Sequence, residues 1–184
     1  DLVTLDQARA VVHNDSTDPV EAGASAAILS AANLITLTAT ITDGDGDTRS
    51  ALANIGDALA FTDHGPTIAR NATTVPTLTV SDSDFATNAS TSFASLFTSS
   101  FGNDGFKDSD NNDVQDADAI SYVLNVSAAN VNSGLVDTLT NLAVVLNKVG
   151  NDIVGTAGIG GPVVFTVSVN ANTGAVTLDQ ARAV

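Results

Sequence analysis

The sequence predicts an all-β fold, an antiparallel sandwich of the immunoglobulin-like or cadherin-like kind with at most one short helix. Residues 34–42 (LITLTATIT) and 163–169 (VVFTVSV) show the alternation that is typical of β-strands. The chain has 4% aromatic residues and no tryptophan, and its small and β-branched apolar side chains suit thin sheets better than helix bundles. Strands do not alternate with long helical segments, so a parallel sheet is not expected.

The first strand is predicted over residues 34–42. Ile35, Leu37, Ala39 and Ile41 fall on one face, and threonines occupy the other. Such a period of two predicts a half-buried antiparallel strand.

The last two strands are predicted as a hairpin. Residues 163–169 precede a turn-rich segment, 170–174, and then a further apolar segment, 175–178. Gly174 can adopt the positive φ that such a turn requires.

Weaker signals fill the middle of the chain. Short strands are predicted at residues 59–62, 78–80, 120–126, 142–146 and 153–154. A turn containing Gly150 is expected over 148–152. The alanine-rich segment 20–33 fits either a short helix or a covering loop, and the spacing of apolar residues within 90–100 fits one helical turn.

The same nine-residue segment occurs near the start and at the end of the sequence. Residues 3–11 (VTLDQARAV) recur unchanged as residues 176–184, at an offset of 173 residues. Self-similarity at a fixed period indicates a tandem array, here of domain-sized copies. We therefore expect residues 1–184 to be one repeat unit of period 173, with adjacent copies as its partners.

The duplication creates a competition for one partner strand, residues 163–169. Closure of a local hairpin favours the C-terminal copy, 176–184. In an intact array, the N-terminal copy would pair with the preceding repeat, so here it is expected to be an unpaired edge or to join another sheet. We expect a conventional repeat boundary near Gly65 and Pro66, with the chain still folding as one unit.

The charge balance excludes several classes of partner. The chain has 21 acidic against 6 basic residues, a formal net charge of −15. Nucleic acid and anionic membrane surfaces need clustered Lys and Arg, and apolar runs such as 142–146 are too short for membrane insertion. All the acids except Glu21 are aspartates, which suit turns and hard-cation sites. The chain has no cysteine, so Ca²⁺ is the expected cofactor that would stabilise a secreted fold.

The strongest metal-binding motif is DSDNNDVQDAD, residues 108–118. Its oxygen-bearing side chains belong to Asp108, Asp110, Asn112, Asp113, Asp116 and Asp118. The start of this loop resembles EF-hand and thrombospondin type 3 calcium loops, although it lacks the glycine at the sixth position and the glutamate at the twelfth. The alternative is an acidic loop exposed to solvent.

A second motif is DGDGD, in which Asp43, Asp45 and Asp47 follow the first predicted strand. Its glycines let the backbone wrap closely around an ion, and a plain hairpin turn is the alternative. Further candidate ligands follow from local spacing: Asp63, Asp82, Asp84, and a looser group of Asp15, Asp18 and Glu21. Asp57 and Asp104 are interpreted as ordinary turn residues.

Two segments resemble a known family. Residues 34–68 (LITLTATITDGDGDTRSALANIGDALAFTDHGPTI) resemble a module of giant bacterial repeats-in-toxin (RTX) adhesins. Residues 163–184, continued after the duplicated segment by Val12 and His13 to read VVFTVSVNANTGAVTLDQARAVVH, are similar to the portion that precedes it. His64 departs from the family pattern, which usually has a second aspartate there. The resemblance implies a calcium-stiffened extender repeat that spaces a distal ligand-binding region from the outer membrane for surface attachment and biofilm formation. It also implies type I secretion and an extracellular place at the bacterial cell surface.

An enzyme and a ligand-binding module are the alternatives to the extender. His13 near Asp15 and His64 beside Asp63 are the only histidine settings, and no nucleophile-elbow or metalloprotease motif is present. No enzymatic activity and no small-molecule substrate are therefore expected. A calcium-dependent ligand-binding module, lectin-like or homophilic, stays open, although few aromatic residues besides Phe106 lie beside the acidic loops.

Overall fold

The computed structural model describes residues 2–13, 15 and 17–184. Within them the regular elements are short β-strands and 3₁₀ turns of three residues. The pairings of β1 with β4, of β2 with β3 and of all neighbours in a six-stranded sheet are antiparallel. The predicted all-β, antiparallel class is confirmed, and the six-stranded sheet is consistent with a β-sandwich. Among the described residues no helix is long and apolar enough to cross a membrane.

The chain forms two compact units. Unit 1 comprises Asp1–Thr67 and Ser99–Gly105, and unit 2 comprises Ile68–Thr98 and Phe106–Val184. This division falls close to the predicted repeat boundary at Gly65 and Pro66, and whether the chain folds as one unit stays a prediction. That residues 1–184 are one repeat of period 173 stays a prediction.

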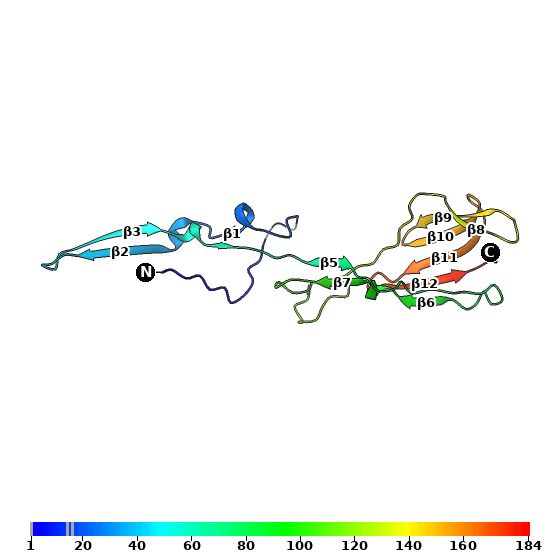
Figure 1. Cartoon of the computed structure of the whole chain (residues 1–184), viewed down its shortest axis with the longest axis horizontal. Helices are drawn as coiled ribbons and strands as arrows, with labels where there is room; N and C mark the ends of the chain where they lie inside the picture. Colours follow the sequence, from blue (N-terminus) through cyan, green and yellow to red (C-terminus); the bar gives the residue numbers. More distant parts are fainter. Residues whose placement is uncertain (1, 14, 16) are drawn as a thin grey trace. The chain divides into compact units, whose positions relative to one another are not determined.

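Unit 1 contains only two-stranded sheets among its described residues (Figure 1). Its elements are η1 Gly23–Ser25, β1 Ala27–Ile28, η2 Ala32–Leu34, β2 Thr36–Thr42, β3 Thr48–Asn54, η3 Gly56–Ala58 and β4 Ala60–Phe61. β1 pairs with β4, and β2 pairs with β3. The segment 20–33, for which a helix or a loop was expected, forms the two 3₁₀ turns η1 and η2 with β1 between them.

The prediction of a half-buried strand over 34–42 was right about the strand and wrong about its burial. All seven residues of β2 are exposed, including Leu37 at 49% and Ile41 at 71%. The periodicity fixes which residues share a face, but β2 and β3 form an isolated hairpin. No second layer covers either face among the described residues of unit 1, so the apolar side of β2 stays in solvent.

Unit 2 is built on one sheet with the strand order β6-β12-β11-β10-β9-β8 (Figure 1). Its strands are β6 Ala89–Ser92, β8 Val131–Val136, β9 Ala143–Val149, β10 Asp152–Ala157, β11 Val163–Val169 and β12 Ala175–Gln180. The remaining elements are β5 Thr67–Arg70 and β7 Phe97–Ser100, which pair with each other, and η4 Ala94–Leu96. The boundary between the two units falls within β5 and β7.

The apolar core lies in unit 2. Val144 of β9, Ala157 of β10 and Val164 of β11 are almost fully buried and pack with Phe165. β10 alternates buried and partly buried residues along its whole length. Gly155 of β10 leaves room for the Phe165 ring, because a Cβ at this position would lie 2.8 Å from it.

The predicted terminal hairpin is confirmed. β11 pairs with β12 through five residue pairs from Phe165–Gln180 to Val169–Val176, and Gly174 in the connecting turn has φ +64°. The C-terminal copy of the duplicated segment is therefore the one that pairs with β11. The N-terminal copy forms no strand over residues 3–11, and residues 3–10 are exposed.

The weaker predictions had mixed outcomes. Strands at 142–146, 153–154 and 59–62 are confirmed within β9, β10 and β4, as is the turn over 148–152. Residues 78–80 and 120–126 form no strand. In the latter segment Tyr122 donates its N–H to the carbonyl of Ala171, and its ring lies against Gly174 and Phe97. The segment thus bonds to a turn instead of joining a ladder.

Candidate metal sites

The DGDGD motif forms the tip of the β2–β3 hairpin. The N–H of Asp43 donates to the carbonyl of Asp47 at 3.0 Å. One carboxylate oxygen of Asp43 accepts the N–H groups of Gly46 at 3.1 Å and Asp47 at 2.8 Å. Gly46 has φ +100°, a conformation that other residues rarely adopt. The backbone of the loop therefore encloses the first carboxylate.

All three aspartates of this tip come together. One carboxylate oxygen each from Asp43, Asp45 and Asp47 lies within 4.8 Å of the others, and all three residues are exposed. The neighbouring Asp45 side chain first, and then the N–H that Asp47 donates, lower the pKa of Asp43. Three oxygen donors, negatively charged at neutral pH, are the donor set of a hard cation such as Ca²⁺. The residues present fit such an ion.

The long acidic loop brings together three of its six predicted ligands. Carboxylate oxygens of Asp108, Asp110 and Asp116 lie within 4.8 Å of one another. The two oxygens of Asp108 accept the N–H of Asn112 at 3.1 Å and that of Asp113 at 2.9 Å. This again is an all-oxygen donor set that suits Ca²⁺.

The missing glycine of this loop has a structural substitute. Counting from Asp108, the sixth position is Asp113, and Asp113 has φ +61°. Aspartate and asparagine are the non-glycine residues that tolerate this left-handed conformation best. The sharp turn for which glycine is usual therefore forms without it.

Of the other predicted ligands of the loop, Asn112 contacts the group through Asp110, and Asp118 pairs with a lysine. The Asn112 amide donates to Asp110 at 2.9 Å, and its oxygen accepts the N–H of Val114 at 2.8 Å. Asp118 forms an ion pair with Lys107. Asp113 belongs to no three-ligand group among the described residues. Spacing along the chain could not separate these residues from the three that converge.

The remaining acidic candidates of unit 2 do not converge. Asp84 accepts the N–H of Ala86 at 3.0 Å and the hydroxyl of Thr87 at 2.6 Å. The bond from the Thr87 hydroxyl, followed by that from the Ala86 N–H, lowers the pKa of Asp84. Within the described chain, neither Asp82 nor Asp84 joins a group of three metal-binding side chains. Asp84 stabilises its own loop.

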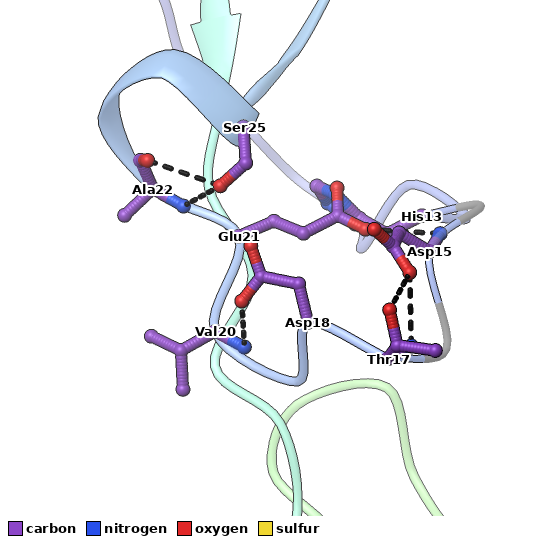
Figure 2. Close-up of polar contacts among 8 residues, drawn as sticks. All are labelled: His13, Asp15, Thr17, Asp18, Val20, Glu21, Ala22 and Ser25. Atoms are coloured by element: carbon purple, nitrogen blue, oxygen red, sulfur yellow. Dashed lines mark hydrogen bonds and ion pairs between the residues drawn. The ribbon is translucent and has the colours of Figure 1, made fainter.

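Glu21 organises the loop of the N-terminal acidic group (Figure 2). It is 5% exposed, and its two oxygens meet His13 Nδ1 at 2.7 Å and the N–H of Asp15 at 3.1 Å. The Asp15 carboxylate accepts the N–H and hydroxyl of Thr17, and Asp18 accepts the N–H of Val20. The three carboxylates thus serve different partners, and no three-ligand group forms among the described residues here.

Asp63 has a partner that the sequence did not indicate. The Asp104 carboxyl shares a hydrogen bond with Asp63, and this bond is the main reason why the pKa of Asp104 is raised. Burial and the negative charge of Asp63 raise the pKa of Asp104 further, and the charge of His13 lowers it. These two aspartates and His13 line one hollow of unit 1. Asp104 was interpreted as a turn residue, and nothing in the local spacing links it to Asp63.

A buried ion pair was also missed. Asp137 is fully buried, and the Arg182 guanidinium donates to its two oxygens at 2.8 and 2.9 Å. Thr140 donates its N–H and hydroxyl to the same carboxylate. The Arg182 bonds first, and then those from Thr140, hold the pKa of Asp137 far below its usual range. This pair ties the end of the C-terminal copy to unit 2.

No curated protein and no solved structure matches the chain. A family model, by contrast, matches most of the sequence, over residues 1–56 and 77–184. The matched residues include both acidic clusters and both copies of the duplicated segment. The chain belongs to the family described as Domain of unknown function (DUF5801).

Proposed function

We propose that this chain is a calcium-stiffened extender repeat of a giant bacterial RTX adhesin. The observation that carries the proposal is the convergence of three carboxylates in each of two loops. The duplicated nine residues support a tandem array, and the resemblance of residues 34–68 to the adhesin module supports the family. In this role the repeat spaces a distal ligand-binding region from the outer membrane, for surface attachment and biofilm formation.

The calcium part of the proposal follows from charge. Two ions, one at each cluster, would change the formal net charge from −15 to about −11 and reduce the self-repulsion that opposes a compact state. Extracellular calcium sites have Kd values of about 10⁻⁴ to 10⁻³ M. An ion at about 100 times its Kd stabilises the folded state by about 2.7 kcal/mol per site. Two such sites would supply a large part of the net stability of a typical domain.

In this proposal the protein acts outside the cell, at the bacterial cell surface. Free Ca²⁺ is scarce in the cytosol and abundant outside the cell, so a chain secreted by a type I system would fold after export. Neighbouring repeats are the partners in this arrangement, and calcium at the loops would turn a flexible chain into a stiffer spacer.

The test is a thermal melt of the full chain with excess Ca²⁺, with excess Mg²⁺ as a control for charge screening, and with chelator. A rise in Tm with Ca²⁺ alone is expected. Asp45→Asn and Asp110→Asn should each reduce the rise, because each removes one carboxylate of a cluster. Asp57→Asn is the matched control outside both clusters. An unchanged Tm with Ca²⁺ would contradict the calcium part of the proposal.

The spacer part needs a separate measurement. A glycan array probed with the chain in Ca²⁺ distinguishes a spacer from a lectin-like module. An extender gives no saturable signal. Saturable binding that free sugar competes away would favour the lectin-like alternative.

A further inference from the structure

The two copies of VTLDQARAV have the same sequence and different structures. In the C-terminal copy, β12 lies between β11 and β6, and Val176 and Gln180 are each 8% exposed. In the N-terminal copy the equivalent of Val176 is Val3, which is 58% exposed, and residues 3–11 form no strand. The difference must come from the surroundings, because the residues are identical.

One local feature is the same in both copies. The Gln180 side chain donates to the Arg182 carbonyl at 2.9 Å, and the equivalent Gln7 donates to the Arg9 carbonyl at 3.0 Å. The end of the N-terminal copy therefore shares this local hydrogen bond with the end of the C-terminal copy. What it lacks is a pair of neighbouring strands.

Specific contacts hold the end of the C-terminal copy, just after β12. The buried carboxylate of Asp137 is bidentate to Arg182, and the N–H of Thr138 donates to the Ala183 carbonyl at 3.1 Å. The equivalent arginine, Arg9, forms no ion pair within the described chain. Every group that recognises residues 176–184 would recognise residues 3–11 equally well.

We propose that residues 3–11 are a docking strand for a second copy of this chain, in which they occupy the position of β12 between β11 and β6. Arg9 then pairs with Asp137 of that copy. The contact is heterologous, so it joins copies head to tail. The biological role of this docking rests on the proposed tandem array. In such an array, this segment would end the sheet of one copy and lead directly into the His13–Glu21 loop of the next.

The test uses the same substitution at the two equivalent positions of the full chain. Thr177 pairs with both Ser168 and Ser90, so Thr177→Pro removes a ladder hydrogen bond from a central strand and disables β12. Docking by residues 3–11 of other molecules should then shift the sedimenting mass from monomer to dimer and longer species as concentration rises. Thr4→Pro alone should behave as the unsubstituted chain. Thr4→Pro with Thr177→Pro should stay monomeric and lose the unfolding transition of unit 2.

Two results would overturn the inference. A Thr177→Pro chain that stays monomeric, with the same melt as the double variant, would show that residues 3–11 do not dock. A monomer that melts above the double variant would show that the strand comes from the same molecule. All the samples are run in chelator and again in Ca²⁺, so that a failure of strand docking is distinguished from a failure of calcium binding.

A second measurement keeps the test valid if Thr177→Pro unfolds the isolated chain. The chain has no cysteine. A Thr177→Pro chain with Ser168→Cys is mixed with an excess of a Thr4→Cys chain, because residue 4 would face Ser168 in the register of β12. With oxidised glutathione as the oxidant, the Thr4→Cys donor should form the disulfide rapidly. A Leu5→Cys donor, whose thiol is displaced by one residue, should form it much more slowly. Equal rates for the two donors would overturn the proposed register.

Discussion

Unit 1 and unit 2 have similar sequence patterns and very different interiors. Every buried apolar side chain among the described residues belongs to unit 2. Among the described residues of unit 1, the one buried side chain is that of Glu21. Both units contain hairpins with clear alternation, β2–β3 and β11–β12. Only the second lies within a sheet wide enough to bury a face. Alternation therefore predicts a strand, and the rest of the sheet decides whether the strand is covered.

The comparison implies different sources of stability. Unit 2 is stabilised by an apolar cluster and a buried ion pair. Unit 1 relies on turns, loop hydrogen bonds and, in our proposal, an ion at the tip of β2–β3. Substitutions inside unit 2 should therefore have the largest effects, and equivalent changes in unit 1 should have small ones.

The largest effect is expected for Arg182→Ala. This change leaves the fully buried Asp137 carboxylate without its cation, which is strongly destabilising. Thermal unfolding at low protein concentration should show a large fall in the Tm of unit 2. The control is Arg9→Ala, the same substitution in the N-terminal copy, which should leave the Tm unchanged. Equal falls in Tm for the two variants would contradict the structure, in which only Arg182 pairs with Asp137.

A smaller loss is expected for Val144→Ala, which creates a cavity in the centre of the core. Val144 is fully buried, and truncation should cost about 2–3 kcal/mol of the free energy of unfolding. Val149 of the same strand is 59% exposed, so Val149→Ala should change it by less than about 0.5 kcal/mol. Urea denaturation monitored by circular dichroism measures both. A small loss at Val144 would indicate a core that relaxes around the cavity.

Opposite pH dependences should separate the two units. Because the pKa of Asp137 is lowered by Arg182, its contribution to unit 2 is full above the unfolded value of about 3.9 and is lost as pH falls below it. Because the pKa of Asp104 is raised by Asp63, the shared hydrogen bond stabilises unit 1 at low pH and is lost as pH rises through the raised value. Hydrogen exchange between pH 3 and 6, read separately for each unit and corrected for intrinsic rates, should show both trends. Parallel trends would argue against these assignments.

Local chemistry in this chain was predictable from sequence. The β11–β12 hairpin, the positive φ of Gly174 and the DGDGD tip follow from short-range patterns. The convergence of Asp108, Asp110 and Asp116 was contained in a predicted set of six, but the contact of the Asn112 amide with Asp110 and the ion pair of Asp118 with Lys107 depend on loop geometry. Spacing alone cannot supply that geometry.

Long-range features were not predictable. Asp137 and Arg182 are 45 residues apart, and they lie in the segments that directly follow β8 and β12 of the same sheet. The missing strand at 120–126 has the same cause, since Tyr122 bonds to the turn at Ala171. The two copies of VTLDQARAV show the limit most directly: no rule that reads the nine residues alone can assign them both a strand and an irregular segment.

The smallest effect is expected at the apolar side of β2. Ile41 is 71% exposed and lies opposite Arg49 of β3. Ile41→Thr retains a β-branched side chain, which suits a strand, and removes apolar area that is mostly in water. The free energy of unfolding of unit 1 should therefore change by less than about 0.5 kcal/mol, measured by urea denaturation in Ca²⁺. A loss above about 1 kcal/mol, in the range typical of buried positions, would mean that this face is covered in solution. In that case the alternation of residues 34–42 would have predicted burial correctly, and unit 1 would have a second layer.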